Sequence, residues 1–173
     1  MIIIHVDYGA PAHEMTPREL SQITDLIIHH SAGSLSETVH DIDSQHRAQG
    51  WSMIGYNFVI TPDGQVYAGR DLHVVPSAAY GRNTQSVNVC LIGNFQQGDK
   101  GYTGPPTKAQ LDSLKALSVS LHKSIPTINC TIAHGDVALK YYASNPGDYA
   151  TACCGSELKA FLPELRSFTQ SGH

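Results

Sequence analysis

Several features that define specialised classes of protein are missing from this sequence. The longest apolar runs, such as residues 1–4 and 26–28, fall far short of the roughly 20 residues that cross a bilayer, so no membrane-inserted segment is expected. Lys and Arg number 11 against 15 Asp and Glu, which gives a formal net charge of -4. This balance supplies no electrostatic surface for nucleic acid or for an anionic membrane, and we expect neither as a partner.

The cysteine content is also too low for a disulfide-rich scaffold. The four cysteines, at positions 90, 130, 153 and 154, do not show the spacing of a small disulfide framework, and 173 residues bury a core without such cross-links. The N-terminus lacks a basic segment followed by an apolar stretch, so we expect cytoplasmic synthesis without a secretory signal. In that reducing compartment the cysteines are free thiols or metal ligands.

The remaining composition is that of an ordinary globular domain, with 41% hydrophobic and 15% charged residues. No repeat, low-complexity segment or Pro/Gly/Ser-rich linker divides the chain. We therefore expect a monomer with one domain, in which an N-terminal strand and loop, residues 1–21, pack on a main unit of residues 22–173.

Strand patterns and helix patterns alternate along the chain. The predicted strands cover residues 26–29, 56–60, 65–68, 87–92 and 127–132, with a Thr-Pro-Asp-Gly turn joining the second and third as a hairpin. The predicted helices cover residues 34–50, 107–126 and 156–168. This alternation indicates an α/β fold in which helices cover a central sheet.

Two of these helices have a recognisable start. Ser34 and Glu37 have the spacing of a capping box before the first helix, and Thr107 and Gln110 have the same spacing before the second. The first helix is expected to end at Gly50, because glycine favours helix termini.

Three residues have the chemistry of a catalytic zinc site. His29 and His134 each stand at the C-terminal end of a predicted strand, and Cys153 follows in a later loop. Two neutral imidazoles and a thiolate are a known ligand set for zinc, and they leave a fourth tetrahedral position open. Spacing alone leaves a second interpretation open, in which the histidines are structural, because the three residues form no local motif.

A family resemblance is carried partly by residues 63–64, 68–70, 83, 86–89 and 91–95 and mainly by five further segments. They are Leu-Ile-Ile-His-His-Ser-Ala-Gly (26–33), His-Arg-Ala-Gln-Gly-Trp (46–51), Ile-Gly-Tyr-Asn-Phe-Val-Ile (54–60), His-Gly-Asp-Val (134–137) and Thr-Ala-Cys (151–153). In this order and spacing they resemble the zinc-dependent N-acetylmuramoyl-L-alanine amidases, the family that joins phage amidase endolysins to peptidoglycan recognition proteins. The resemblance extends over residues 22–166, most of the chain.

The resemblance implies a fold, a reaction and a metal. The fold is a mixed central β-sheet flanked by helices, and residues 22–173 become the amidase catalytic domain. The reaction is hydrolysis of the amide bond between N-acetylmuramic acid and L-alanine in peptidoglycan. By position in the motifs, His29, His134 and Cys153 hold one Zn²⁺ per chain. Tyr56 assists the zinc-bound water or the oxyanion, and Thr151 contacts the polarised carbonyl.

Substrate contacts are expected from His30, Trp51, Asn83 and Tyr142. Three of these four, His30, Trp51 and Tyr142, have a structural alternative. His30 follows His29 in the strand and points the opposite way, which favours packing. Trp51 and Tyr142 have the aromatic rings that stack on sugars, but such rings equally pack in cores and loops.

The sequence departs from the family pattern between His134 and the end of the site. Cys153-Cys154-Gly155 stands where the family has Cys-Pro-Gly, and we expect Cys153 to be the ligand and Cys154 to pack against the last helix. The chain between His134 and Cys153 is longer than is typical, and we expect residues 139–150, with three tyrosines, to form a wall or lid of the substrate groove. A floppy insertion is the alternative.

Three functional hypotheses remain at this point. The first is an amidase that acts on the cell wall after release or delivery, in lysis or wall turnover. The second is a non-catalytic peptidoglycan-binding module, which the retained Cys153 disfavours because binding members of the resembled family have lost that ligand. The third is an amidase toxin delivered to rival bacteria.

Overall fold

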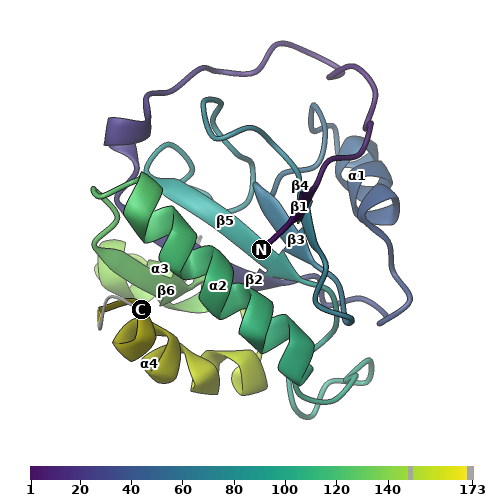
Figure 1. Ribbon diagram of the computed structural model, residues 1–173, viewed down its shortest axis with the longest axis vertical. Helices are drawn as coiled ribbons and strands as arrows, with labels where there is room; N and C mark the ends of the chain where they lie inside the picture. The colour runs from purple at the N-terminus through teal and green to yellow at the C-terminus, as the bar shows by residue number, and fades with distance from the viewer. Residues whose placement is uncertain (148–149, 171–173) are drawn as a thin grey trace.

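The computed structural model describes residues 1–147 and 150–170, and its framework is a mixed six-stranded sheet (Figure 1). The strand order is β1-β4-β3-β5-β2-β6. β3 and β4 form an antiparallel hairpin, and the other neighbours pair in parallel. The strands are β1 (Ile3–Ile4), β2 (Asp25–His30), β3 (Phe58–Ile60), β4 (Val66–Ala68), β5 (Ser86–Leu91) and β6 (Cys130–Ala133).

The helices cover both faces of the sheet. Figure 1 shows α2 crossing one face with α4 beside it. Val39 and Ile42 of α1 pack on the other face with Val59 and Cys90, and α3 packs near them on β2 and β6. The helices are α1 (Val39–Ala48), α2 (Lys108–Ser124), α3 (His134–Tyr141) and α4 (Ser156–Gln170), with a short 3-10 helix η1 (Leu20–Gln22) before β2.

β2 and β5 form the centre of the sheet, and every residue in both strands is buried. Successive side chains of a strand point to opposite faces. Leu26 and Ile28 therefore join the core under α2 and α4, whereas Ile27 packs on the α3 side. His29 has the same parity as Ile27, so its side chain is buried on the face that carries α1 and α3.

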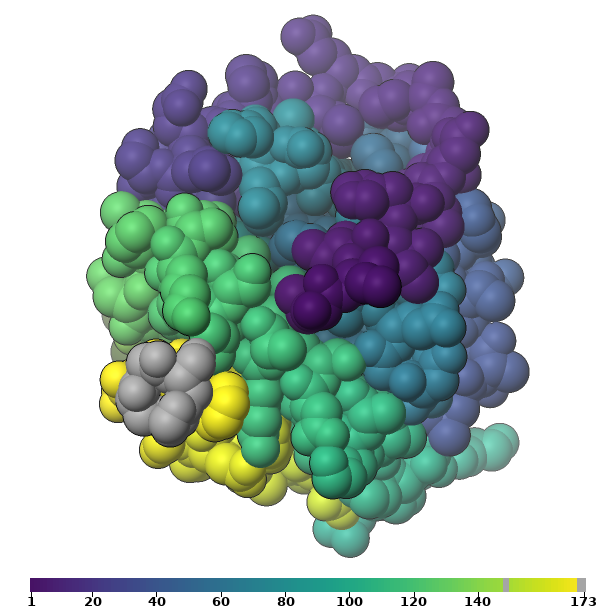
Figure 2. All heavy atoms as spheres, viewed as in Figure 1, coloured from purple at the N-terminus to yellow at the C-terminus, as the bar shows by residue number. Residues whose placement is uncertain are grey.

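The N-terminal segment lies along the outer edge of the sheet. Ile3 pairs with Val66 and Ile4 with Tyr67, so β1 covers the free edge of β4. Figure 2 shows this segment, in purple, lying on the surface of the molecule. None of the helices within residues 1–147 and 150–170 has both the length and the apolar character needed to cross a membrane.

The predicted α/β fold with a mixed sheet and flanking helices is confirmed, and so are the hairpin and the start of α2. Thr107 Oγ1 accepts a hydrogen bond from Gln110 N at 3.1 Å, and Gln110 Oε1 accepts one from Thr107 N at 3.1 Å. These reciprocal bonds are the capping box that the sequence spacing predicts.

The predicted start of the first helix is wrong. The capping box is formed by Thr38 and Asp41, whose side chains each accept a hydrogen bond from the other residue's backbone N–H. Ser34 Oγ instead accepts from Ser36 N, and the Glu37 carboxylate accepts from Gln45 Nε2 at 2.8 Å. Because those side chains are engaged elsewhere, the N-cap of α1 is Thr38, four residues after the predicted cap.

The segment after β6 also differs from the prediction. His134 begins α3, which the sequence analysis did not predict, and this helix continues through Tyr141 into the segment expected to form a wall or lid. Tyr149, one of the three tyrosines expected there, and residues 171–173 of the predicted domain lie outside the described residues.

Candidate metal centre

The fold brings His29 and His134 together through the pairing of two neighbouring strands. β2 and β6 are parallel, and their register ends at Ile28 opposite Ala133. The next residue of each chain segment is therefore a histidine at the same edge of the sheet. The two imidazole centroids lie 4.6 Å apart.

Cys153 completes the group from the loop before α4. Its Sγ lies 3.6 Å from His29 Nδ1, and one nitrogen or sulfur atom from each of the three residues lies within 4.8 Å of the others. Within the described residues, this is the one group of three or more potential His, Cys, Asp or Glu ligands close enough to share a metal.

Gly135 allows the cysteine loop to lie against the first turn of α3. The Gly135 backbone N–H donates to Cys153 O. A Cβ atom at position 135 would lie 2.5 Å from Thr151 O and 2.7 Å from Cys153 O, so a side chain would push the loop away. Glycine is required here for close packing of two backbones.

The adjacent cysteine has different surroundings. Cys154 is fully buried in the main core together with Leu158 of α4, whereas Cys153 is half-buried beside the two histidines. The position of Cys154 therefore agrees with the packing role expected for it.

Burial keeps the two imidazoles neutral at physiological pH. It lowers the pKa of His134 to about 4, and burial together with the neighbouring His134 lowers the pKa of His29 well below its ordinary value. Both rings therefore offer a lone pair to a cation. Burial raises the pKa of the Cys153 thiol to about 12, so a bound cation would have to stabilise the thiolate.

This donor set fits zinc. Nitrogen and sulfur donors in a group of three match the preference of zinc and leave a fourth coordination position. The thiol is the soft donor that distinguishes such a site from the oxygen-rich sites of calcium and magnesium.

Tyr56 lies next to this group. Its ring centroid is 5.2 Å from that of His29, and the residue immediately precedes the Asn57 and Phe58 backbone that leads into β3. Burial and the nearby Cys90 thiol raise the pKa of Tyr56 well above its ordinary value. A phenol is protonated at neutral pH even at its ordinary pKa of about 10, so Tyr56 can donate a hydrogen bond, and the shift disfavours its ionisation further.

A hollow of about 460 Å³ lies next to His134, one of the three candidate ligands. Among the predicted site residues, His134, Thr151, Trp51 and Asn83 line it. Thr151 Oγ1 accepts a hydrogen bond from Cys153 N at 3.2 Å, which leaves its hydroxyl hydrogen available. The remaining lining residues are Ser77, Ala78, Tyr80 and Ala150.

Trp51 and Asn83 also have structural contacts. The Trp51 ring lies 4.4 Å from the ring of His46, centroid to centroid. Asn83 Oδ1 accepts from Ala78 N at 2.9 Å and from Ala79 N at 2.8 Å. Both side chains are thus held in place by the fold while they line the hollow.

The structure does not support the substrate contact expected from His30. This residue is 7% exposed, and its Nδ1 accepts a hydrogen bond from Phe95 N at 3.1 Å. Its position next to His29 in a strand directs it to the opposite face. Tyr142 also lies outside the lining of the hollow, and its hydroxyl donates to Gly81 O at 2.7 Å.

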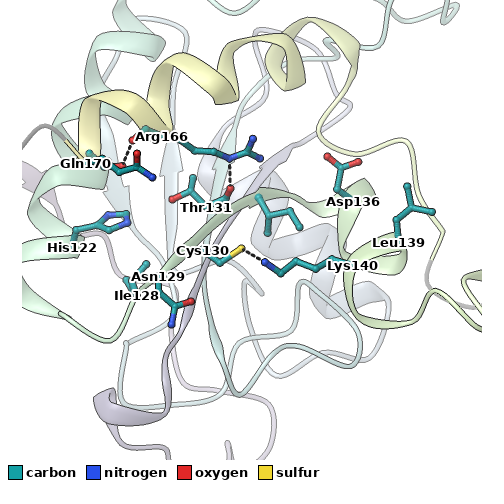
Figure 3. A pocket seen from close by; sticks show the side chains of 12 residues that line it. His122, Ile128, Asn129, Cys130, Thr131, Asp136, Leu139, Lys140, Arg166 and Gln170 are labelled. Atoms are coloured by element: carbon teal, nitrogen blue, oxygen red, sulfur yellow. Dashed lines mark hydrogen bonds between the residues drawn. The ribbon is translucent and has the colours of Figure 1, made fainter.

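A second cavity, of about 610 Å³, lies at the edge strand β6, and none of the three candidate ligands lines it (Figure 3). Lys140 Nζ lies 3.2 Å from Cys130 Sγ there, and Arg166 Nε donates to Thr131 O at 2.7 Å. The cavity is therefore separate from the candidate metal centre.

Asn88, whose Oδ1 lies 2.8 Å from His29 Nε2, is not among the residues predicted for the site. The signal was available, because Asn88 interrupts the apolar run of a strand that was predicted to be central. A buried amide needs hydrogen-bond partners, and a neighbouring buried histidine supplies one.

Comparison with known proteins agrees with this geometry. The family model described as N-acetylmuramoyl-L-alanine amidase matches residues 19–148. The endolysin of Enterobacteria phage T3 is 41% identical over 118 residues, which cover 66% of this chain and 76% of the endolysin. The endolysin of Escherichia phage T7 is 44% identical over 102 residues, 57% of this chain and 66% of that protein.

Solved structures show the same fold over almost the whole chain. The N-acetylmuramoyl-L-alanine amidase LysC from Clostridium intestinale URNW superposes with a TM-score of 0.76 at 28% identity, covering 96% of each chain. The wild-type peptidoglycan recognition protein LB of Drosophila gives a TM-score of 0.70 at 26% identity, covering 93% of each chain. This chain therefore belongs to the N-acetylmuramoyl-L-alanine amidase family and is a peptidoglycan amidase.

Proposed function

We propose that the chain is a zinc-dependent amidase that hydrolyses the bond between N-acetylmuramic acid and L-alanine, with one zinc held by His29, His134 and Cys153. The observation that carries this proposal is the convergence of these three residues from separate segments, with their ligand atoms within 4.8 Å of one another. Zinc bound there supplies the Lewis acidity that amide hydrolysis needs at neutral pH.

The protein residues around the ligands have defined tasks in this proposal. Tyr56, whose phenol is protonated at neutral pH and whose pKa burial raises further, donates a hydrogen bond to the oxyanion that develops on the scissile carbonyl. Thr151 is held beside Cys153 by its bond to the Cys153 N–H and directs its hydroxyl to the same carbonyl.

Substrate binding is assigned to the hollow next to His134. Its aromatic, hydroxyl and amide lining, which includes Trp51, Asn83 and Thr151, suits the sugar ring and the peptide bonds of a muropeptide. In this arrangement the bond between N-acetylmuramic acid and L-alanine lies between the hollow and the three proposed ligands. The enzyme would act at the cell wall as a monomer.

Zinc analysis combined with product analysis tests the proposal. Purified protein is expected to contain one zinc per chain and to release from sacculi stem peptides that begin with a free L-alanine amino group, identified by mass spectrometry. Chelator-treated protein should lose this activity and recover it with zinc. If the metal-free protein releases stem peptides at the normal rate, or if another bond is cut, the proposal is wrong.

The second candidate, a binding module without catalysis, predicts a different result. Such a protein would retain sacculi in a pull-down assay but release no peptides. The presence of Cys153 beside the two histidines favours the enzyme, because a binding module has no need of a thiol at that position.

A further inference from the structure

Asn88 lies on the same face of the sheet as His29 and contacts the imidazole nitrogen other than the one that lies near Cys153. The two residues belong to adjacent strands, since β2 and β5 pair in parallel. Asn88 is fully buried, and its Oδ1 lies 2.8 Å from His29 Nε2. His29 Nδ1, on the other side of the ring, lies 3.6 Å from Cys153 Sγ.

The orientation of the Asn88 amide is fixed by its other contacts. Nδ2 donates to Ser86 Oγ at 2.8 Å and lies 3.5 Å from the Ser86 carbonyl oxygen. A carbonyl oxygen only accepts hydrogen bonds, so the nitrogen of the amide must face Ser86 and the oxygen must face His29.

The backbone of Asn88 is held as well. Its N–H donates to Asn57 Oδ1 at 2.9 Å, and its carbonyl accepts from Asn57 N at 3.0 Å. Asn57 Nδ2 in turn donates to Arg70 O at 2.9 Å. Buried hydrogen bonds therefore connect Asn88 to Asn57 and Asn57 to Arg70. They hold Asn88 in a fixed position, so that it does not move when the His29 ring rotates.

These contacts determine which nitrogen of His29 carries the proton. Asn88 Oδ1 has lone pairs and no hydrogen, so the 2.8 Å contact requires a hydrogen on His29 Nε2. In a neutral imidazole the other nitrogen, Nδ1, then has a free lone pair. That lone pair points toward the sulfur of Cys153. The ring of His134 lies 4.6 Å from that of His29, centroid to centroid.

We propose that Asn88 is a positioning residue that holds His29 in the tautomer and ring orientation in which Nδ1 is the metal-binding atom. This inference rests on the proposed function for the identity of the metal, whereas the tautomer of His29 is a property of the metal-free chain. The amide does this without charge, so Cys153 remains the one anionic donor among the three proposed ligands.

The expected effect on metal binding has a known size. When a metal-binding histidine loses the hydrogen-bond partner of its other ring nitrogen, metal affinity typically falls by about 10- to 100-fold. Asn88→Ala should therefore weaken zinc binding by that factor. Asn88→Asp keeps an acceptor oxygen opposite Nε2 and should restore most of the affinity.

The test compares these two variants with a buried control in the same sheet. Thr131→Val changes a buried position of β6 to a residue of similar shape and leaves the Asn88 contacts intact. Zinc affinity is measured by competition with a chromogenic chelator. Long-range ¹H–¹⁵N NMR of the metal-free, histidine-labelled protein reports which nitrogen of His29 carries the hydrogen, without zinc or activity.

Wild type, Thr131→Val and Asn88→Asp are expected to show a single His29 tautomer with hydrogen on Nε2, and Asn88→Ala a mixture of two. The inference is overturned if folded Asn88→Ala keeps the single tautomer and binds zinc within twofold of wild type. If Asn88→Ala does not fold, a mixed tautomer in the metal-free wild type overturns it equally. A wild type that binds no zinc but shows the single tautomer would contradict the proposed function and not the tautomer assignment.

Discussion

The thiols of Cys153 and Cys154 are neighbours in sequence but face different parts of the molecule. Cys153 faces His29 and His134, and Cys154 is fully buried in the core with Leu158. We therefore expect Cys153→Ser to lose zinc and activity, because a serine hydroxyl does not replace a thiolate donor. Cys154→Ser should keep both and lose about 1–3 kcal/mol of unfolding free energy, because it buries a hydroxyl.

Zinc content, sacculus turnover and urea unfolding of the two serine variants decide this prediction. Each variant is the control for the other, since the chemical change is identical and only the position differs. If Cys154→Ser alone loses zinc, the sulfur ligand is Cys154 and not Cys153. The role proposed for Thr151, which depends on its position beside Cys153, would then also lose its basis.

Tyr56 provides a second prediction at the scale of one residue. The proposed mechanism assigns its hydroxyl to the developing oxyanion, and the proposed metal ligands are other residues. Tyr56→Phe should therefore bind zinc normally but lose about 10²–10³ in kcat, the usual cost of removing one oxyanion donor. Single-turnover hydrolysis of a muropeptide measures this, and an unchanged kcat would exclude Tyr56 from the reaction.

The site residues differ in how far the sequence alone predicted them. The ligand candidates were predicted from family motifs, and their convergence follows from the parallel register of β2 and β6. Strand alternation indicated that His30 points away from His29, and Asn88 interrupts the apolar run of a central strand, but the hydrogen-bond partners of both side chains could not be predicted. Whether a buried polar side chain faces a groove or a hydrogen-bond partner depends on which strands are neighbours, and that information is absent from a single strand's sequence.

At the scale of elements, the best predicted features depend on local chemistry. The hairpin β3–β4 and the cap of α2 depend on a few adjacent residues. The start of α1 was misplaced because Glu37 is engaged by Gln45, eight residues away. α3 was missed because it is short, begins with His134-Gly135 and takes much of its stability from packing of Val137 on Ile27 and Ile132.

The segment after α3 gives the prediction that belongs to this scale. Tyr141 donates to Asp25 Oδ1 at 2.8 Å, and Tyr142 donates to Gly81 O at 2.7 Å. Arg82, which is paired with Asp25 at 2.5 Å, lies 4.0 Å above the Tyr141 ring. These contacts join the end of α3 to the loop before β5, which contributes to the other side of the hollow.

We therefore expect the two tyrosines to fix a wall of the substrate groove. The double change Tyr141→Phe and Tyr142→Phe removes both hydroxyl contacts and keeps the rings, so KM for sacculi should rise several-fold while zinc content and kcat stay near wild type. Leu139→Ala, at a 65% exposed position of the same helix, is the control. Unchanged KM in the double variant would favour an insertion without a role in substrate binding.

At the scale of the whole molecule, the fold does not distinguish cutting from binding. The chain shares its architecture both with the amidase LysC and with peptidoglycan recognition proteins, at TM-scores of 0.70 to 0.76. A shared fold hosts different functions, and the residues of the site decide between them. In this chain the deciding feature is the group of His29, His134 and Cys153, buried on the α1 and α3 face of the sheet.

The buried histidines also affect the stability of the whole molecule. Burial lowers the pKa of His46 and of His134 to about 4, from 6.5 in an exposed histidine. Between pH 6.5 and about 4 the unfolded chain therefore binds more protons than the folded chain. Stability must fall as pH falls through this window, with a slope of at most about 1.4 kcal/mol per pH unit for each such histidine. Below about pH 4 both states are protonated and the slope from these groups vanishes.

His46 allows this effect to be measured apart from the candidate ligands. Its Nδ1 accepts a hydrogen bond from Gly55 N at 2.9 Å, which requires an unprotonated nitrogen. Glutamine offers an acceptor oxygen and does not titrate. His46→Gln should therefore lower the number of protons taken up on unfolding by about one, and the slope of unfolding free energy against pH should fall in proportion. Urea unfolding of chelator-treated wild type and variant at intervals from pH 7 to 4.5 measures both slopes. Equal slopes in the two proteins would show that His46 is already protonated in the fold and that the Gly55 bond is not maintained.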